Sequence, residues 1–180
     1  ELDALNSRYK SNRKEFGVLY GRRRIGKSSI LNEFLKGKKG ILFQAKQDNS
    51  YGNLKSFSYE VDHLLNLPDT FVFASWQHAF KSIQEYAKNE RFVLVIDEYP
   101  YIVSQDSSFS SVLQEFIDHA SDNMMVILSG SDIGFLQKEI QNHASPLYKR
   151  RTFEMEIKKM NFMDAKEFVE MEDVESQANY

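Results

Sequence analysis

The sequence of 180 residues contains no cysteine, and this absence removes two classes of protein from consideration. Without cysteine there is no disulfide framework and no zinc site built on thiolates. The lack of disulfides fits a reducing compartment, so we expect a cytoplasmic location. No apolar run reaches the length of a membrane span, and no signal peptide is visible at the amino terminus. We therefore expect no membrane partner.

Two familiar kinds of catalytic centre are also missing. The four histidines are widely separated and lack the spacing of metal ligands; they are His63, His78, His119 and His143. Residues 130–134 carry a serine, but not at the position that the G-x-S-x-G turn of α/β-hydrolases requires. No internal repeat or low-complexity tract is present. Hydrolysis by a histidine-based or serine-based centre is therefore not indicated.

The chain does have enough apolar residues for a core, with 42% hydrophobic residues and 14 phenylalanines. Its length suits one α/β domain with room for part of a second. The net charge of −3 is unevenly spread, because residues 1–40 hold 11 Lys/Arg against 4 Asp/Glu. A basic region of this kind is expected where a polyanionic nucleotide binds. The chain starts with Glu rather than Met, which suggests a piece of a longer protein.

The basic region contains Gly-Arg-Arg-Arg-Ile-Gly-Lys-Ser at residues 21–28, which matches the phosphate-binding P-loop G-x-x-x-x-G-K-[ST]. Residues 16–20 before it predict a short buried strand, and residues 29–35 after it predict a helix with one apolar side. This strand–loop–helix context is the one that the motif requires. Phosphate oxygens would meet backbone N–H groups of the loop and the positive end of the helix.

Each residue type in the loop has a chemical reason. Gly21 and Gly26 let the backbone curl without Cβ clashes. Lys27 is expected to reach the β- and γ-phosphates, and the Ser28 hydroxyl to ligate Mg²⁺. The predicted nucleotide-binding residues are Gly21, Arg22, Arg23, Arg24, Ile25, Gly26, Lys27, Ser28 and Ser29. For Arg22 and Arg23 the simpler interpretation is a solvated loop; the alternative is that one of the three arginines contacts nucleotide or a neighbouring subunit.

A second motif lies at residues 92–98, Phe-Val-Leu-Val-Ile-Asp-Glu. Five consecutive apolar residues predict a strand buried on both faces, as in a parallel sheet. Asp97 at the end of this strand is expected to hold Mg²⁺ opposite Ser28, and Glu98 to polarise a water for attack on the γ-phosphate. Downstream of a P-loop, this pair indicates an enzyme that hydrolyses a nucleoside triphosphate with its own glutamate.

Hydrophobic spacing predicts a repeated βα order and hence a parallel sheet. The predicted strands are 16–20, 41–43, 92–96, 124–128 and 153–157. The predicted helices are 2–14, 27–36, 54–65, 75–87, 112–120 and 132–142, and residues 48–52 are predicted to form a loop. Near the end of this series, Arg150 and Arg151 precede the last strand. They form either a surface charge run or an arginine finger that acts on a neighbouring subunit.

Four segments together resemble the prokaryotic and archaeal-type AAA+ ATPases, relatives of the STAND NTPases. These segments are residues 20–28, 95–101, 128–131 and 145–151, and the resemblance covers nearly the whole chain. It implies a three-layer αβα P-loop NTPase fold of the α/β class. It implies a five-stranded, mostly parallel sheet of order 5-1-4-3-2, with Mg²⁺-dependent ATP binding and hydrolysis.

The resemblance also implies catalytic roles. A polar sensor of the γ-phosphate is placed at Ser131 or Ser129, although the same segment also reads as a helix start capped by Asp132. The arginine finger is placed at Arg150, with Arg151 second. The predicted catalytic residues are Lys27, Glu98, Ser131 and Arg150, and the predicted metal ligands are Ser28 and Asp97. The sequence departs from the family pattern at Lys149, where glycine is common, and at Asp132, where a small residue is common.

Members of this family usually continue into a helical lid, a winged-helix domain and often a nuclease-like domain. We therefore expect an ATPase core at residues 1–160 and the start of a lid at 161–180. Two functions follow. The chain either hydrolyses ATP to drive or gate a carboxyl-terminal effector, or it is a slow ATP/ADP switch of the STAND kind. The expected partners are ATP or ADP, further copies of the chain through the finger, and nucleic acid through a carboxyl-terminal domain.

Overall fold

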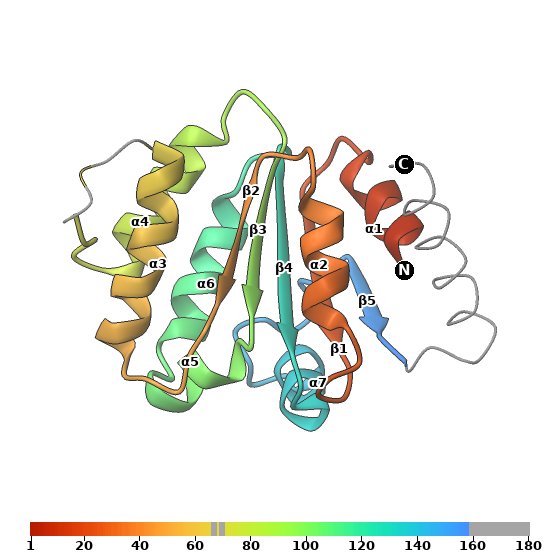
Figure 1. Cartoon of the computed structure of the whole chain (residues 1–180). Coiled ribbons are helices and arrows are strands. Elements are labelled where there is room, and N and C mark those ends of the chain that lie inside the picture. The colour runs from red at the N-terminus through yellow and green to blue at the C-terminus, as the bar shows by residue number, and fades with distance from the viewer. Residues whose placement is uncertain (66–67, 69–70, 159–180) are drawn as a thin grey trace, which may run out of the picture.

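The five strands of the described part of the chain lie in one sheet, and all neighbouring strands are parallel (Figure 1). The structure is a computed structural model that describes residues 1–65, 68 and 71–158. The strands are β1 (Glu15–Tyr20), β2 (Gly40–Gln44), β3 (Phe92–Asp97), β4 (Met124–Gly130) and β5 (Phe153–Glu156). Their order, β2-β3-β4-β1-β5, is the predicted 5-1-4-3-2 read from the other edge. The predicted fold class and sheet order are thus confirmed.

Strands β3 and β4 run through the middle of the sheet, and every residue of both is buried. Leu94 pairs with Val126 and Val95 with Ile127, so the two strands present matching side chains. The first pair belongs to the core on one face of the sheet and the second pair to the core on the other face. This burial on both faces explains why both segments are almost continuously apolar.

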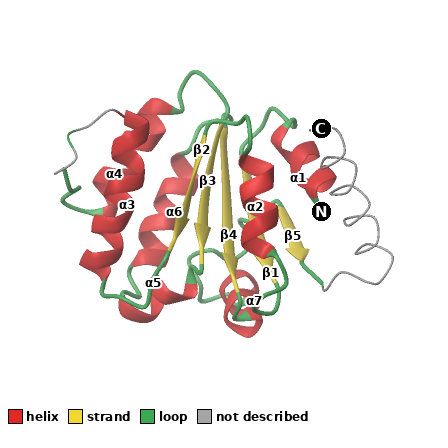
Figure 2. Ribbon diagram, in the orientation of Figure 1, coloured by secondary structure: helices red, strands yellow, loops and turns green. Residues whose placement is uncertain are grey.

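Helices cover both faces of the sheet and complete the predicted three layers (Figure 2). The described helices are α1 (Leu2–Tyr9), α2 (Lys27–Leu35), α3 (Ser50–Leu65), α4 (Trp76–Tyr86), α5 (Pro100–Gln105), α6 (Phe109–His119) and α7 (Ile133–Gln141). Helices α1 and α2 supply Leu5, Leu31 and Phe34 to the smaller core. The larger core lies under α3 to α7 and is rich in aromatic rings, among them Trp76 and Phe109 at 4.8 Å between centroids.

The predicted first helix, 2–14, is wrong at its carboxyl-terminal end. Helix α1 ends at Tyr9, and strand β1 already begins at Glu15. Asn12 between them has a φ of +52°, a left-handed conformation that a helix cannot continue through. Residues 10–14 are polar or charged and add no apolar side chain to the buried face of the helix. No burial of apolar surface would therefore stabilise a longer helix.

The side chain of Glu15 is the reason that the strand starts early. Glu15 is fully buried, and its carboxylate accepts hydrogen bonds from Ser11, Arg13 and Thr152. Burial by itself would raise the pKa of Glu15, but these hydrogen bonds outweigh it and the pKa is lowered. A buried, paired carboxylate at this point fastens the loop after α1 to the chain before β5.

Other elements also differ from the sequence prediction, among them helix α6, which begins at Phe109 rather than at residue 112. Helix α3 begins at Ser50, inside the predicted loop 48–52, because Asn53 holds the preceding chain through its contacts with Lys46 and Asp48. Helix α5 was not predicted, since it has only six residues and starts with Pro100. The caps predicted at Ser75 and Asp132 are confirmed, as each side chain accepts a backbone N–H three residues on.

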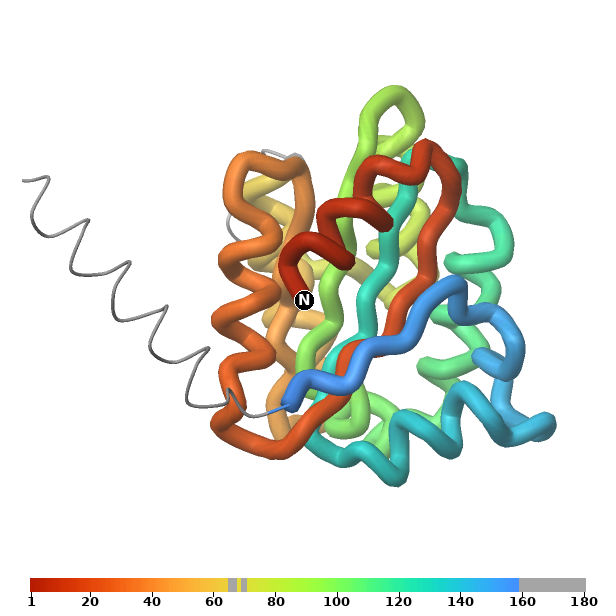
Figure 3. The backbone as a smooth tube through the Cα atoms, turned by 90° about the vertical axis from the view of Figure 1, so that its right-hand side faces the viewer, coloured from red at the N-terminus to blue at the C-terminus, as the bar shows by residue number. Residues whose placement is uncertain are grey.

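The carboxyl ends of all five strands meet at one edge of the sheet, at the bottom of Figure 1. Figure 3 views the sheet from its β5 side and keeps that edge at the bottom. In parallel α/β sheets ligands bind outside this edge, so the loops after β1, β3 and β4 define the region to inspect. The expected start of a lid, 161–180, lies outside the described residues. Among the described helices, none combines the length and apolar character needed to cross a bilayer.

Candidate functional site

The loop from Gly21 to Gly26 connects β1 to α2, and its two glycines are needed for different reasons. A side chain on Gly21 would lie 2.4 Å from the Ile157 carbonyl oxygen, so only hydrogen fits there. Gly26 has open space around it, but its φ of +93° is left-handed and favours glycine. Helix α2 starts directly after Gly26 and has no side-chain cap. Its first N–H groups are therefore available to an anion.

Lys27 and Ser28 project from the first turn of α2 in two directions. Lys27 is buried, and its Nζ donates to the carbonyl oxygens of Gly21 at 2.9 Å and Arg22 at 3.1 Å. The ammonium group is thus folded back over the phosphate-binding loop. Ser28 Oγ donates to Asp97 Oδ2 at 2.7 Å, across 69 residues of sequence. The two predicted metal ligands are therefore in direct contact.

These residues fit a magnesium nucleotide. Asp97 is 1% exposed, and a carboxylate this deeply buried needs a positive partner or donors around it. Its second oxygen, Oδ1, accepts the Glu98 N–H at 3.0 Å. The described residues contain no group of three or more His, Cys, Asp or Glu that could hold a metal by itself. Mg²⁺ commonly takes only one or two protein ligands and completes its shell with phosphate and water, which matches the Ser28–Asp97 pair.

Glu98 follows Asp97 and turns the chain sharply into helix α5. Its φ of +52° is uncommon for a residue with a side chain. The turn directs its carboxylate toward the end of β4, where Oε2 accepts the Ser131 N–H at 3.3 Å and the Ser131 Oγ hydroxyl at 3.1 Å. The two strand ends predicted to carry the base and the sensor therefore meet through these two residues.

The structure separates the two serines that the sequence left open as sensors. Ser129 points into the fold, is fully buried, and its hydroxyl has no hydrogen-bond partner among the described residues. Ser131 lies two residues further on and contacts Glu98. Of the two serines, Ser131 is thus the one that contacts the predicted base Glu98.

Arg23 and Tyr101 add a contact that the sequence analysis did not assign. Arg23 is exposed, yet its NH2 nitrogen donates to Tyr101 Oη at 2.9 Å and its Nε to Ser131 Oγ at 3.4 Å. Tyr101 sits in the first turn of α5, which begins two residues after Glu98. In the sequence, the only indication of this contact was that Tyr101 lies three residues after Glu98. That spacing places Tyr101 beside the site only if residues 100–105 form a helix.

The loop and the strand ends enclose two adjoining hollows at the sheet edge. The first, of about 350 Å³, is lined by Arg23, Arg24, Gly26, Lys27, Ser28, Ser29 and Glu98. The second, of about 260 Å³, is lined by Arg22, Ile25, Ile133, Glu156, Ile157 and Lys158. Every predicted nucleotide-binding residue except Gly21, whose carbonyl oxygen instead accepts Lys27, lines one of the two hollows.

The arginines before β5 lie elsewhere. Arg150 forms a two-pronged ion pair with Asp118, Nε to Oδ1 at 2.8 Å and NH2 to Oδ2 at 2.9 Å. The Arg150 guanidinium lowers the pKa of Asp118 below its ordinary value. Asp118 is in the last turn of α6, before β4, so this pair lies at the amino-terminal edge of the sheet. Arg151 is paired with Glu154 at 2.9 Å. The sequence-predicted finger is not brought to the P-loop of its own chain.

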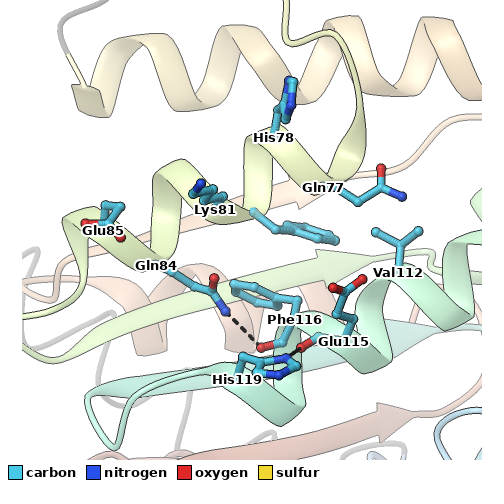
Figure 4. Close-up of a pocket in the computed structure, with 10 residues that line it drawn as sticks. Gln77, His78, Lys81, Gln84, Glu85, Val112, Glu115, Phe116 and His119 are labelled. Carbon is cyan, nitrogen blue, oxygen red and sulfur yellow. Dashed lines mark hydrogen bonds between the residues drawn. The ribbon is translucent and has the colours of Figure 1, made fainter.

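A further hollow of about 350 Å³ lies between α4 and α6 (Figure 4). Its wall is braced by the Gln84 amide, which donates to the Phe116 carbonyl at 3.1 Å, while His119 Nδ1 lies 2.9 Å from the Glu115 carbonyl. Its lining combines aromatic and mixed charged groups, without a glycine loop or a paired hydroxyl and carboxylate. It therefore lacks the features that distinguish the edge site.

A comparison of sequences decides the family. The model of a family described as an ATPase domain predominantly from Archaea matches residues 1–179. The chain belongs to this archaeal-type ATPase family. An uncharacterized protein of Methanocaldococcus jannaschii is 28% identical over 170 residues, which are 93% of this chain and 36% of that protein. The resemblance inferred from the motifs is thereby confirmed.

Solved structures share the fold of this ATPase domain. A Walker-type ATPase of Pyrococcus abyssi superimposes with a TM-score of 0.76 at 21% identity, over 98% of this chain and 57% of that one. The ORC2 protein of Aeropyrum pernix, solved in ADPNP-ADP complexes, gives 0.69 at 15% identity, over 94% and 50%. The ORC1 protein of the same organism, in complex with DNA, gives 0.62 at 13% identity, over 89% and 44%. The ATPase domain thus spans about a third to three fifths of the length of these relatives.

Proposed function

We propose that this chain binds ATP with Mg²⁺ at the edge site and hydrolyses it. The observation that carries this proposal is the 2.7 Å contact between Ser28 Oγ and Asp97 Oδ2, with Glu98 next in sequence. This contact joins the P-loop helix to the end of β3, so it brings together the two residues proposed to hold Mg²⁺. The ATPase family to which the chain belongs supports the same conclusion.

The protein groups have separable roles in this proposal. The Gly21–Ser29 loop and the start of α2 bind the phosphates through backbone N–H groups, and Lys27 moves its ammonium group from two carbonyls to the β- and γ-phosphate oxygens. Ser28 and Asp97 hold Mg²⁺, which neutralises charge on the phosphates. Glu98 orients a water and accepts its proton as that water attacks the γ-phosphate. Ser131 positions the Glu98 carboxylate.

Two variants test the proposal together. Lys27→Ala removes the charge on the phosphates and is expected to weaken ATP binding strongly in calorimetry. Glu98→Gln keeps the size of the side chain but cannot accept a proton, so it is expected to bind ATP and to abolish turnover. Equal ATP binding by Lys27→Ala and the parent would refute the site. Turnover by Glu98→Gln at the parent rate would refute the base.

A slow ATP/ADP switch is the second candidate, and a specific contact favours it. Glu98 Oε2 accepts two hydrogen bonds from Ser131, which hold the carboxylate against the end of β4. In a switch this contact would persist with ATP bound and keep hydrolysis slow. We propose that such a switch would gate a carboxyl-terminal effector domain or nucleic-acid contacts outside this chain. Single-turnover and steady-state rates separate the candidates: fast rates in both indicate steady hydrolysis, whereas a slow single turnover, or a steady state much slower than the single turnover, indicates a switch.

A further inference from the structure

Arg23 differs from Arg150 and Arg151 in the chemistry of its partners. Its two side-chain hydrogen bonds go to the hydroxyl groups of Tyr101 and Ser131, which are neutral. Within residues 1–65, 68 and 71–158, no carboxylate forms an ion pair with Arg23. Arg150 and Arg151, by contrast, are each paired with an acidic side chain. The Arg23 guanidinium is therefore held in place while its charge stays available to an anion.

The position of this guanidinium points to one phosphate in particular. Arg23 lines the same hollow as Lys27 and Glu98. It is joined to Glu98 by way of Ser131, because Ser131 Oγ accepts from Arg23 and donates to Glu98. The phosphate that lies beside the attacking water is the γ-phosphate, since that is the group transferred. A cation two hydrogen bonds from the base is therefore next to the terminal phosphate rather than the first or second.

We propose that Arg23 binds the γ-phosphate within the same chain and so sets the preference for ATP over ADP. Tyr101 acts as a positioning residue, because its hydroxyl orients the guanidinium from the 2.9 Å contact on α5. A planar guanidinium can bind two oxygens of one phosphate through two parallel N–H bonds, a fixed geometry that the ammonium group of a lysine does not provide. This inference rests on the proposed ATP site and adds to it the source of its discrimination.

Calorimetry in the presence of Mg²⁺ tests the inference, with ADP and a non-hydrolysable ATP analogue as the two ligands. Arg23→Ala is expected to weaken the analogue roughly 10- to 100-fold, the range of a charged hydrogen bond, and ADP only slightly. Arg23→Lys is expected to recover part of the loss. Tyr101→Phe is expected to lower the analogue-to-ADP affinity ratio by a smaller factor. Lys10→Ala, an exposed cation after α1, is the charge-matched control and is expected to leave the ratio unchanged.

The outcomes separate this inference from the proposed function. Binding of both ligands by the parent, with an unchanged affinity ratio in Arg23→Ala, overturns the role of Arg23 and leaves the ATP site intact. An equal loss for both ligands also overturns it, because Arg23 would then act on the shared phosphates or on the loop. A parent that binds neither ligand overturns the proposed function and this inference with it. A loss of affinity for the ATP analogue but not for ADP, in both Arg23→Ala and Tyr101→Phe, supports the binding role of Arg23 and the positioning role of Tyr101.

Discussion

At the scale of single residues, the site depends on backbone conformations that side chains seldom adopt. Glu98 has a φ of +52° and Arg24 a φ of +62°. Such residues cost of order 1–3 kcal/mol and persist only where the surroundings enforce them. For Glu98 the enforcement is visible, since Asp97 accepts its N–H and Ser131 donates to its carboxylate. The strain therefore lies on the proposed base and is held there by the predicted metal ligand Asp97 and the predicted sensor Ser131.

The two serines at the end of β4 give a matched pair for testing this. Ser131→Ala removes the hydroxyl that contacts Glu98, and we expect turnover to fall roughly tenfold or more with little change in ATP affinity. Ser129→Ala removes a buried hydroxyl without a partner among the described residues, so activity is expected to stay and stability to be equal or slightly higher. Steady-state ATPase rates and urea unfolding measure the two effects. A loss of turnover in Ser129→Ala alone would reverse the assignment.

Lys149 has a left-handed backbone conformation at a position where the family pattern commonly has glycine. The family resemblance marks this position as one where glycine is common, and the structure gives Lys149 a φ of +58°. Glycine adopts the left-handed conformation without cost, whereas lysine does so with local strain. The lysine therefore strains the backbone at this position but leaves the course of the chain unchanged. The sequence identified the position, but only the backbone angle explains it.

At the scale of elements, the buried strands were predictable and the short polar connections were not. Strands 92–96 and 124–128 were predicted because both faces are covered and the segments are apolar throughout. Helix α5 was missed because six residues are too few for a clear period, and with it the role of Tyr101 was missed. The helix predicted over 2–14 ran too far because nothing in residues 10–14 signals the buried contacts of Glu15. Contacts between distant residues decide such boundaries.

The Arg150–Asp118 pair ties the chain before β5 to helix α6, and its strength depends on pH. The lowered pKa of Asp118 means that folding favours its charged form. The resulting stability is therefore present above the unfolded pKa near 3.9 and is lost as the pH falls through the lower folded value. We expect Asp118→Asn to be less stable than the parent at pH 7, by no more than about 1 kcal/mol because the pair is partly exposed.

Urea unfolding at pH 7, 5 and 3 measures this difference between the parent and Asp118→Asn. The difference is expected to persist at pH 5 and to shrink at pH 3, because the lowered pKa of Asp118 means that its stabilising effect is lost as the pH falls below the unfolded value toward the folded one. Glu60→Gln, on the exposed side of α3, serves as a control for the loss of one acidic charge. A difference that is constant from pH 7 to pH 3 would show that the Arg150–Asp118 pair does not stabilise the fold electrostatically.

At the scale of the whole molecule, the two sets of arginines lie at opposite edges of the sheet. The P-loop follows β1, whereas Arg150 precedes β5 and is paired with a residue that precedes β4. In a parallel sheet these positions cannot meet within one chain. If Arg150 completes a phosphate site, that site belongs to another copy, and the cations proposed for the chain's own site are Lys27 and Arg23.

We expect this chain alone to hydrolyse ATP slowly, with a rate per molecule that rises with protein concentration. An arginine donated by a neighbour is worth roughly 10³–10⁵ in rate in other phosphoryl-transfer enzymes, and dilution removes it. In the assembled protein Arg150→Ala is expected to cut turnover with little loss of ATP affinity, and Arg151→Ala to cut it less.

Asp118→Asn is the decisive control, because it breaks the same ion pair but leaves Arg150 in place. If Arg150 is a finger, Asp118→Asn keeps or raises the rate; if Arg150 only fastens β5 to α6, both variants lose activity alike. A fast rate that is independent of concentration and unchanged by Arg150→Ala would exclude the donated arginine.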